Sequence, residues 1–222
     1  MIRFVILLFI SLLALPLSAQ NLIERDQYLF NLPPDSLFLH NIIKKDTISI
    51  TFMSDQKDTA RYRRIVTGIG SWTIQKTEMN DRMLESIQLA SGWEYRFDRP
   101  LKMLPPSFKT WENFSSESEF TAYHKGTRRG KGIFKIGIKV QNKDSARTPL
   151  RNFGDCIVLT TNASTTGSGF PKFSYNLKEW YARDAGLVKL AGSYTIGVNK
   201  TFKIASNLVR VQLRGEQLEG RN

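Results

Sequence analysis

The segment Phe134-Lys135-Ile136-Gly137-Ile138-Lys139-Val140 decides the fold class of this chain. Apolar residues alternate with lysine or glycine, so the period is two rather than 3.6. A strand with this pattern buries one face and exposes the other to solvent. The same alternation occurs in 47–52 and in 93–97, so the sequence predicts many half-buried strands.

Outward from this segment, the second half of the chain reads as a meander of short strands. We expect strands at the positions 116–124, 155–162, 173–181, 186–194 and 201–213. Gly-rich turns at 126–132 and 165–171 and a loop at 143–154 separate some of them.

The first half of the mature chain is less regular. Strands are expected within 47–52, 61–79 and 84–97, and a proline-bearing loop over 100–113, with Phe108 and Trp111 folding back onto the core. A short helix is expected from a cap at Asp35-Ser36 to about Lys44. The predicted fold class is mainly β: an antiparallel meander curved into an open barrel or sandwich, with little helix apart from the N-terminal signal segment.

The first nineteen residues read as an export signal. Arg3 precedes an apolar run, broken by Pro16, that ends in the small-residue site Leu17-Ser18-Ala19. A membrane anchor is the alternative, but the run is short for a spanning helix. We therefore expect a cleaved signal peptide at 1–19, a single β-rich domain at 20–222, and a periplasmic or extracellular location in a bacterial envelope. The processed protein is not expected to span a membrane.

The chain has one cysteine, Cys156, so no internal disulfide can form. Its strand-like context, Cys156-Ile157-Val158-Leu159, predicts a buried small hydrophobe rather than a nucleophile. The histidines, His40 and His124, lie in unrelated contexts, so neither a base for the thiol nor a metal site is expected.

Positive charge is concentrated in the second half of the chain. The net charge is +12, and residues 112–222 hold 18 basic and 9 acidic residues, against 13 and 11 in residues 20–111. Within 125–151, nine basic residues accompany a single acid, Asp144. The alternation places Lys135 and Lys139 on one strand face, and the preceding turn would supply Arg128, Arg129 and Lys131.

This basic ribbon suggests an anionic partner. The candidates are an anionic lipid, an acidic polysaccharide or an acidic protein. Nucleic acid is not expected, because export removes the usual partner. The alternative is a solvated face whose lysines discourage edge pairing between sheets.

Searches for catalytic motifs find none. The chain has no G-x-S-x-G elbow, no H-E-x-x-H and no C-x-x-C, and no cofactor or metal is expected. Glu117 and Glu119 share one face of a predicted strand, as a glycosidase pair could, but such neighbours are usually solvated.

Two segments carry a resemblance to a known family. Asp155-Cys156-Ile157-Val158-Leu159 and the later Trp180-Tyr181-Ala182-Arg183-Asp184-Ala185-Gly186-Leu187-Val188-Lys189 resemble the pattern of the TapB-like family of bacterial secreted proteins, a domain of unknown function. The similarity covers about residues 85–195 and implies a β-rich extracytoplasmic fold. Asp184-Ala185 stand where such proteins more often have Gly-Val.

The residues of the second segment also predict a local structure by themselves. Trp180 and Tyr181 would end a strand on opposite faces, and Gly186 would take a positive φ in the following turn. We therefore interpret this motif as a structural hairpin.

Two hypotheses about function remain open. The first is a non-enzymatic extracytoplasmic binding or assembly protein, which presents a basic sheet face to an anionic envelope partner or holds a ligand in a concave apolar site. The second is a carbohydrate-active β-fold hydrolase with dispersed Asp/Glu catalysts.

Overall fold

A computed structural model describes residues 22–28, 36–54, 58, 60–141, 143–183, 185–198, 200–213 and 216–219. The predicted signal segment 1–19 lies outside them. Strands dominate this part of the chain, and its helical structure is one 3₁₀ turn, η1 (Arg25–Gln27). No helix in these ranges is long and apolar enough to cross a membrane. The predicted mainly β class is confirmed.

The strands of the first half are β1 (Ile23–Glu24), β2 (Ser36–Asn41), β3 (Asp46–Ser54), β4 (Arg61–Val66), β5 (Gly70–Lys76), β6 (Arg82–Leu89), β7 (Trp93–Lys102) and β8 (Ser107–Phe108). Those of the second half are β9 (Asn113–His124), β10 (Thr127–Val140), β11 (Asp144–Arg147), β12 (Asn152–Ser168), β13 (Phe173–Ala182), β14 (Gly186–Ile196), β15 (Lys200–Leu213) and β16 (Glu216–Glu219).

Twelve of the described strands form an antiparallel barrel. Their order is β10-β9-β7-β6-β5-β4-β3-β2-β15-β14-β13-β12. The ring closes because β10 also pairs with β12, from Lys131 opposite Ser168 to Val140 opposite Leu159. β11 and β16 lie outside the ring, and β1 pairs with β8 in a separate ribbon. The curved meander is therefore closed rather than open.

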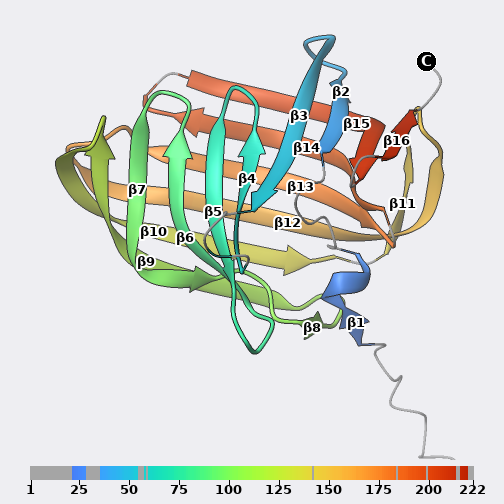
Figure 1. The fold of residues 1–222 in the computed structure, drawn as a ribbon, viewed down its shortest axis with the longest axis horizontal. Helices are drawn as coiled ribbons and strands as arrows, with labels where there is room; N and C mark the ends of the chain where they lie inside the picture. The colour runs from blue at the N-terminus through green and yellow to red at the C-terminus, as the bar shows by residue number, and fades with distance from the viewer. Residues whose placement is uncertain are drawn as a thin grey trace, which may run out of the picture.

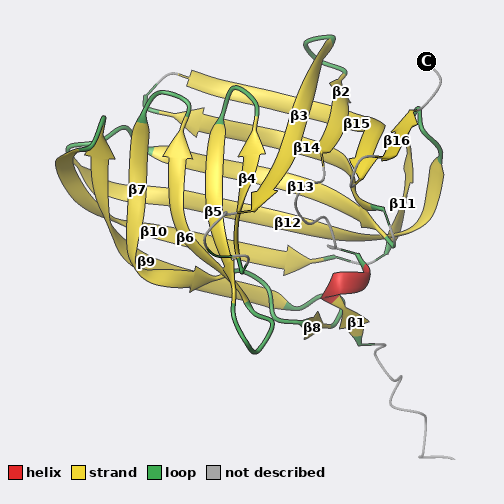
Figure 2. Cartoon of the chain, in the orientation of Figure 1, coloured by secondary structure: helices red, strands yellow, loops and turns green. Residues whose placement is uncertain are grey.

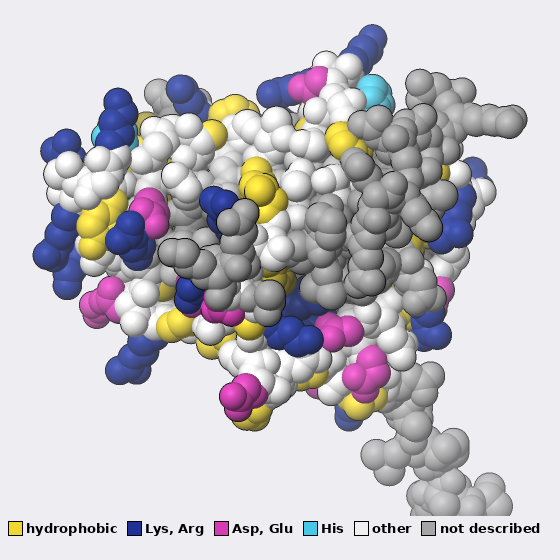
Figure 3. Space-filling model, in the orientation of Figure 1, with side chains coloured by type: hydrophobic (Ala, Val, Ile, Leu, Met, Phe, Trp, Pro, Cys, Tyr) yellow, Lys and Arg dark blue, Asp and Glu magenta, His cyan; other side chains and the backbone are white. Residues whose placement is uncertain are grey.

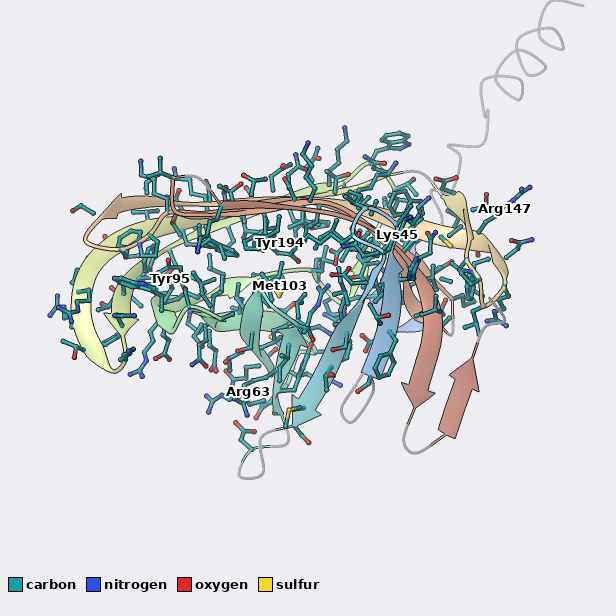
Figure 4. The ribbon with its side chains drawn as sticks, turned by 90° about the horizontal axis from the view of Figure 1, so that it is seen from above. Lys45, Arg63, Tyr95, Met103, Arg147 and Tyr194 are labelled. Atoms are coloured by element: carbon teal, nitrogen blue, oxygen red, sulfur yellow. The ribbon has the colours of Figure 1, made fainter. Side chains whose placement is uncertain are left out.

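The barrel is flattened into two layers. Figures 1 and 2 show β3 to β7 crossing in front of β12 to β15, whose strands run in a different direction. Seen from above in Figure 4, Tyr95, Tyr194 and Met103 lie between the layers. Trp72 of the front layer contacts Tyr175 and Tyr194 of the back layer, with ring centroids 6.5 and 6.0 Å apart. Aromatic side chains thus fill much of the interior, as expected for a barrel that packs its own core.

Several local predictions are wrong. Residues 36–41 form β2 instead of a helix, because Leu37 and Leu39 alternate into the core with period two. Phe108 is buried as expected, but Trp111 is 56% exposed.

The turn expected at 126–132 and the loop expected at 143–154 are also shorter than predicted. Only Lys125 and Gly126 separate β9 from β10, with φ angles of 50° and 80°, as in the two-residue turns that match strand twist. β11 and the start of β12 occupy part of 143–154.

Candidate functional site

The predicted alternation in β10 is present. Phe134, Ile136 and Ile138 are buried in the barrel, and Lys131, Lys135 and Lys139 are exposed on its outer surface. Successive lysines are four residues apart, about 13 Å along an extended strand. They therefore form a row of separated positive charges.

Arg128 and Arg129 lie within β10 itself, not in a turn before it. Both are exposed, and the register with β9 shifts between Arg128 and Gly130. The bulge separates the two arginines from the regular alternation that aligns the three lysines. The five predicted basic residues thus occupy one strand, but only the lysines share a continuous row.

Lysines from distant parts of the sequence extend this row into a face. Lys178 of β13, Lys189 of β14 and Lys203 of β15 occupy outward positions of the strands that follow β10 and β12 in the barrel. We call the outer surface of β10, β12, β13, β14 and β15 the lysine face. Its six lysines are Lys131, Lys135, Lys139, Lys178, Lys189 and Lys203.

The outward positions of these five strands, within their described and regularly paired parts, hold no aspartate or glutamate. The other outward residues are mostly small and polar, and they line up across the strands. One row reads Lys135, Ser164, Ser174, Thr195 and Thr201, and the next reads Gly137, Asn162, Asn176, Ser193 and Lys203. Each row crosses five strands, roughly 19 Å. The face therefore offers hydroxyl and amide groups between ammonium groups.

A shallow hollow lies in the middle of the lysine face. Its volume is about 530 Å³, and Lys135, Ser115, Asn162 and Asn176 are among its lining residues. Gly137 has no side chain there, and a Cβ built on it would meet no atom closer than 4.0 Å. The glycine therefore leaves open space rather than permitting a close backbone approach.

The contacts of the lysines leave most of their charge available. Lys135 Nζ lies 2.9 Å from Glu117 Oε2 of neighbouring β9, but both side chains are at least 60% exposed, so the pair is weak. Lys139 Nζ lies 5.7 Å from the centroid of the Trp111 ring. Such a cation–π contact orients the ammonium group without neutralising it.

Trp180 of β13 contacts two other lysines of the lysine face. The ammonium groups of Lys178 and Lys189 lie 4.8 and 4.6 Å from its ring. Its Nε1 donates a hydrogen bond of 3.1 Å to Asp144 Oδ2 of β11. That bond, a backbone hydrogen bond at Ser145 and the two lysine charges lower the pKa of Asp144, so this carboxylate stays ionised beside the face.

The structural turn motif is a hairpin between β13 and β14, as the sequence predicts. Gly186 has a φ of 70°, which glycine adopts without strain. Trp180 faces outward, whereas Tyr181 lines the barrel interior. Asp184 lies outside the described residues.

A surface hollow of about 560 Å³ beside β9 brings three carboxylates together, those of Asp98, Glu117 and Glu119. Glu117 and Glu119 both lie on the exposed side of β9, and Glu117 pairs with Lys135. No group of three His, Cys, Asp or Glu residues in the described part of the chain could hold a metal ion. Cys156 is fully buried, and burial, together with the charges of Asp144 and Asp155, raises its pKa to about 11 against a backbone hydrogen bond at Ala146 that lowers it.

Lys178, Lys189 and Lys203 were not predicted as site residues from the sequence. The signal was present, since each lysine lies in a segment with period-two alternation. The alternation predicts which side chains of a strand point outward, but it does not predict which strands lie next to one another in the barrel. Only the order of the strands shows that the three consecutive strands β13, β14 and β15 bring their lysines to the surface that β10 also lines.

Comparison with known proteins gives little further guidance. No family model matches the chain, and no curated protein is similar to it. A crystallised protein of Parabacteroides distasonis ATCC 8503, provisionally described as a lipoprotein, is 12% identical, with a TM-score of 0.41 over 86% of this chain and 99% of that chain. The resemblance to TapB-like proteins therefore stays a prediction.

Proposed function

We propose that this protein is a non-enzymatic extracytoplasmic binding protein that attaches through its lysine face to an acidic polysaccharide. The main support for the proposal is the uneven distribution of charge on the barrel surface. The outward positions of five adjacent strands, where they are described and regularly paired, hold six lysines and no carboxylate. An unbalanced field of one sign attracts and orients a polyanion. The predicted export signal and the TapB-like resemblance support an extracytoplasmic location.

The chemistry of the face favours a polysaccharide over a lipid surface. A protein that lies on a membrane also inserts apolar side chains. On the five strands of the lysine face the exposed large apolar residue is Ile133, at 39% exposure, and Trp180 is buried. At the edge of the face, Trp111 is 56% exposed but its ring is in contact with Lys139. The rows of serine, threonine and asparagine instead offer hydrogen-bond donors and acceptors to sugar hydroxyls.

The hydrolase hypothesis finds less support. Glycoside hydrolysis uses two carboxyl groups that flank the bond to be cleaved. The outward positions of the lysine face have none, and an interior cavity is lined by one, Glu179. The hollow beside β9 is lined by Asp98, Glu117 and Glu119, but Glu117 is paired there with Lys135. A binding role fits these residues better than a catalytic one.

The test compares two charge-matched variants by titration with polygalacturonate, a chain of carboxylated sugars. In the first, all six lysines of the lysine face are changed to glutamine. In the second, glutamine replaces six exposed cations that lie elsewhere: Arg63, Lys76, Arg96, Arg99, Lys102 and Lys109. Both variants lose the same net charge, so a difference between them reports position rather than total charge.

The wild type should bind polygalacturonate with an affinity that falls as salt rises, and should not bind neutral dextran. At about 0.5 kcal/mol per lysine, the first variant should bind about 100-fold more weakly. The second should stay within about threefold of the wild type. Equal losses in both variants would contradict the proposal, and binding to anionic vesicles but not to polygalacturonate would assign the face to a lipid surface.

A further inference from the structure

An exposed tryptophan lies at the edge of the lysine face. Trp111 is in the turn that leads into β9, and it is 56% exposed. The remaining tryptophans of the chain are buried or half-buried: Trp72, Trp93 and Trp180. A single exposed apolar side chain is common on protein surfaces, but the backbone and the neighbours of Trp111 are unusual.

The backbone of Trp111 adopts a conformation that disfavours a large side chain. Its φ is 68°, in the left-handed region that glycine occupies without strain. Hydrogen bonds to the end of β10 nevertheless fix the turn. Trp111 N donates to Val140 O at 2.8 Å, and Val140 N donates to Glu112 O at 2.9 Å. The indole is therefore presented to solvent from a strained but firmly held backbone, a combination that is frequent at functional sites.

The indole ring lies on the same outer side of the barrel as the lysines. Lys139 Nζ is 5.7 Å from the ring centroid, near the outer limit of a cation–π contact. Because Lys139 points outward from β10, the ring that it contacts also lies on the outer surface. The ammonium group covers only part of the ring, since Trp111 stays 56% exposed. An open aromatic surface thus lies next to a positive charge.

The hollow of the lysine face begins one row further along β10. Lys139 pairs with Asn113 of β9, and Gly137, which lines the hollow, pairs with Ser115. Two residues along a strand span about 7 Å. A chain molecule that lies along β10 would therefore contact the indole, the Lys139 ammonium group and the hollow in succession.

A carboxylated sugar matches this arrangement. One side of a pyranose ring presents several C–H groups, and the negative face of an aromatic ring attracts them. The carboxylate of the same sugar would accept a hydrogen bond from the Lys139 ammonium group. Its hydroxyls, and those of the next sugar, would meet the polar side chains of the hollow. A polyanion without C–H groups, such as polyphosphate, could use the lysines only.

We propose that Trp111 stacks on a uronic acid residue of the polysaccharide, and that Lys139 pairs with the carboxylate of that residue. This subsite rests on the proposed function of the lysine face and gives it selectivity. The lysines attract a polyanion of any kind, whereas Trp111 favours one that is built from sugars.

The test compares polygalacturonate with polyphosphate by titration of the wild type and of Trp111→Ala. Loss of the stacking contact should weaken polygalacturonate binding by about tenfold. Polyphosphate should bind the variant as tightly as it binds the wild type, because all six lysines remain. Undiminished polygalacturonate binding, or an equal loss for both polymers, would overturn the proposal.

Two further variants separate binding from backbone effects. Trp111→Gly also removes the ring, but glycine adopts the left-handed conformation without strain. It should therefore unfold at a Tm no lower than that of Trp111→Ala and bind polygalacturonate as weakly. Met79→Ala, which removes an 80% exposed apolar side chain from the turn between β5 and β6, should bind as the wild type does. Recovery of binding in Trp111→Gly would attribute the loss to the backbone and overturn the proposal.

Acrylamide quenching of tryptophan fluorescence tests the contact itself. Trp111 is the exposed tryptophan of the chain, so it should account for most of the quenching in the free protein. Saturating polygalacturonate should reduce quenching in the wild type, and saturating polyphosphate should not. Trp111→Phe should show no such protection. Unchanged quenching of the wild type with polygalacturonate bound would contradict stacking on Trp111.

Failure of this subsite and failure of the proposed function give different results. If the six-lysine variant loses polygalacturonate binding and Trp111→Ala does not, the face binds polyanions without stacking, and only the subsite is wrong. If the six-lysine variant binds as the wild type does, or the wild type binds no polygalacturonate, both proposals fail.

Discussion

The two outer faces of the barrel treat positive charge differently. On the face formed by β3 to β7, three cations form ion pairs with carboxylates: Arg61 with Glu85 at 2.7 Å, Arg96 with Glu94 at 2.9 Å, and Lys102 with Asp81 at 3.0 Å. Figure 3 shows basic and acidic side chains next to one another on this side. On the lysine face the outward positions carry lysines without carboxylates, but two carboxylates reach the face from its edges. Glu117 of β9 pairs with Lys135, and Asp144 of β11 lies near Lys178 and Lys189.

This contrast shows that the excess charge of the chain is not spread evenly. A net charge of +12 alone would predict good solubility and weak attraction to any polyanion. The lysines that have no carboxylate beside them are concentrated on one layer of the barrel. A polyanion is therefore attracted to that layer in particular. The outer face of β3 to β7, which carries both basic and acidic side chains, then serves as an internal control for each experiment on the lysine face.

The largest expected effect is the difference in stability cost between breaking a buried ion pair and breaking a surface ion pair. Glu179→Gln leaves the mostly buried Arg64 charge without its partner and should lower the free energy of unfolding by about 3–5 kcal/mol. Glu85→Gln breaks the surface pair with Arg61 and should cost at most about 1 kcal/mol. Urea unfolding of both variants measures the difference, and equal costs would show that the interior pair is not effectively buried.

A second expected effect is a difference in stability between glycine-to-alanine changes on the inward and outward sides of β10. A Cβ at Gly132 would fall 2.3 Å from Thr166 O and 2.8 Å from Phe120 Cζ, whereas Gly137 has open space. Gly132→Ala should therefore destabilise the barrel by about 1–3 kcal/mol, as overpacking does. Gly137→Ala should change stability by less than about 0.5 kcal/mol, since it lies on the surface. Chemical unfolding tests both, and a costly Gly137→Ala would mean that the hollow is not open.

A smaller effect concerns pH at the end of the barrel. Tyr28 Oη donates to Asp155 Oδ2 at 3.0 Å, and Lys143 Nζ lies 3.0 Å from Asp155 Oδ1. Burial raises the pKa of Asp155, but these hydrogen bonds and the charges of Lys143 and Arg183 outweigh it and lower the pKa. A lowered carboxyl pKa adds stability that is complete above the unfolded value of about 3.9 and is lost as pH falls through the folded value.

Asp155→Asn should therefore reduce stability at pH 7 by about 0.5 kcal/mol, because the site is half exposed. The variant should also lose less stability than the wild type between about pH 5 and pH 2. Thermal melts across this range measure both. A parallel pH profile in the two proteins would contradict the role of Asp155.

The fold class was accessible from sequence because alternation acts locally. Phe134 to Val140 specify a strand with one buried face whatever strand lies beside it. Leu37 and Leu39 show the limit, since a polar cap residue in front of a short apolar run fits a helix or a strand equally well. Tertiary pairing with β3 and β15 decides the case.

The candidate site was accessible only in part, for a related reason. Lys131, Lys135 and Lys139 follow from the pattern of one strand. Their joining with Lys178 and Lys203 requires closure of the barrel by β10 and β12, which is a non-local pairing. The meeting of Arg64 with Glu179, 115 residues apart, depends on the two layers facing each other and leaves no local sequence signal.

The most direct test of the central claim is lysine acetylation of the wild-type protein with and without polygalacturonate, read by mass spectrometry. We expect the bound polymer to slow acetylation of the six lysines of the lysine face: Lys131, Lys135, Lys139, Lys178, Lys189 and Lys203. Lys76, Lys102 and Lys109 should react at the same rate with and without it. Equal protection of both sets, or protection of the second set alone, would contradict a binding role for the lysine face.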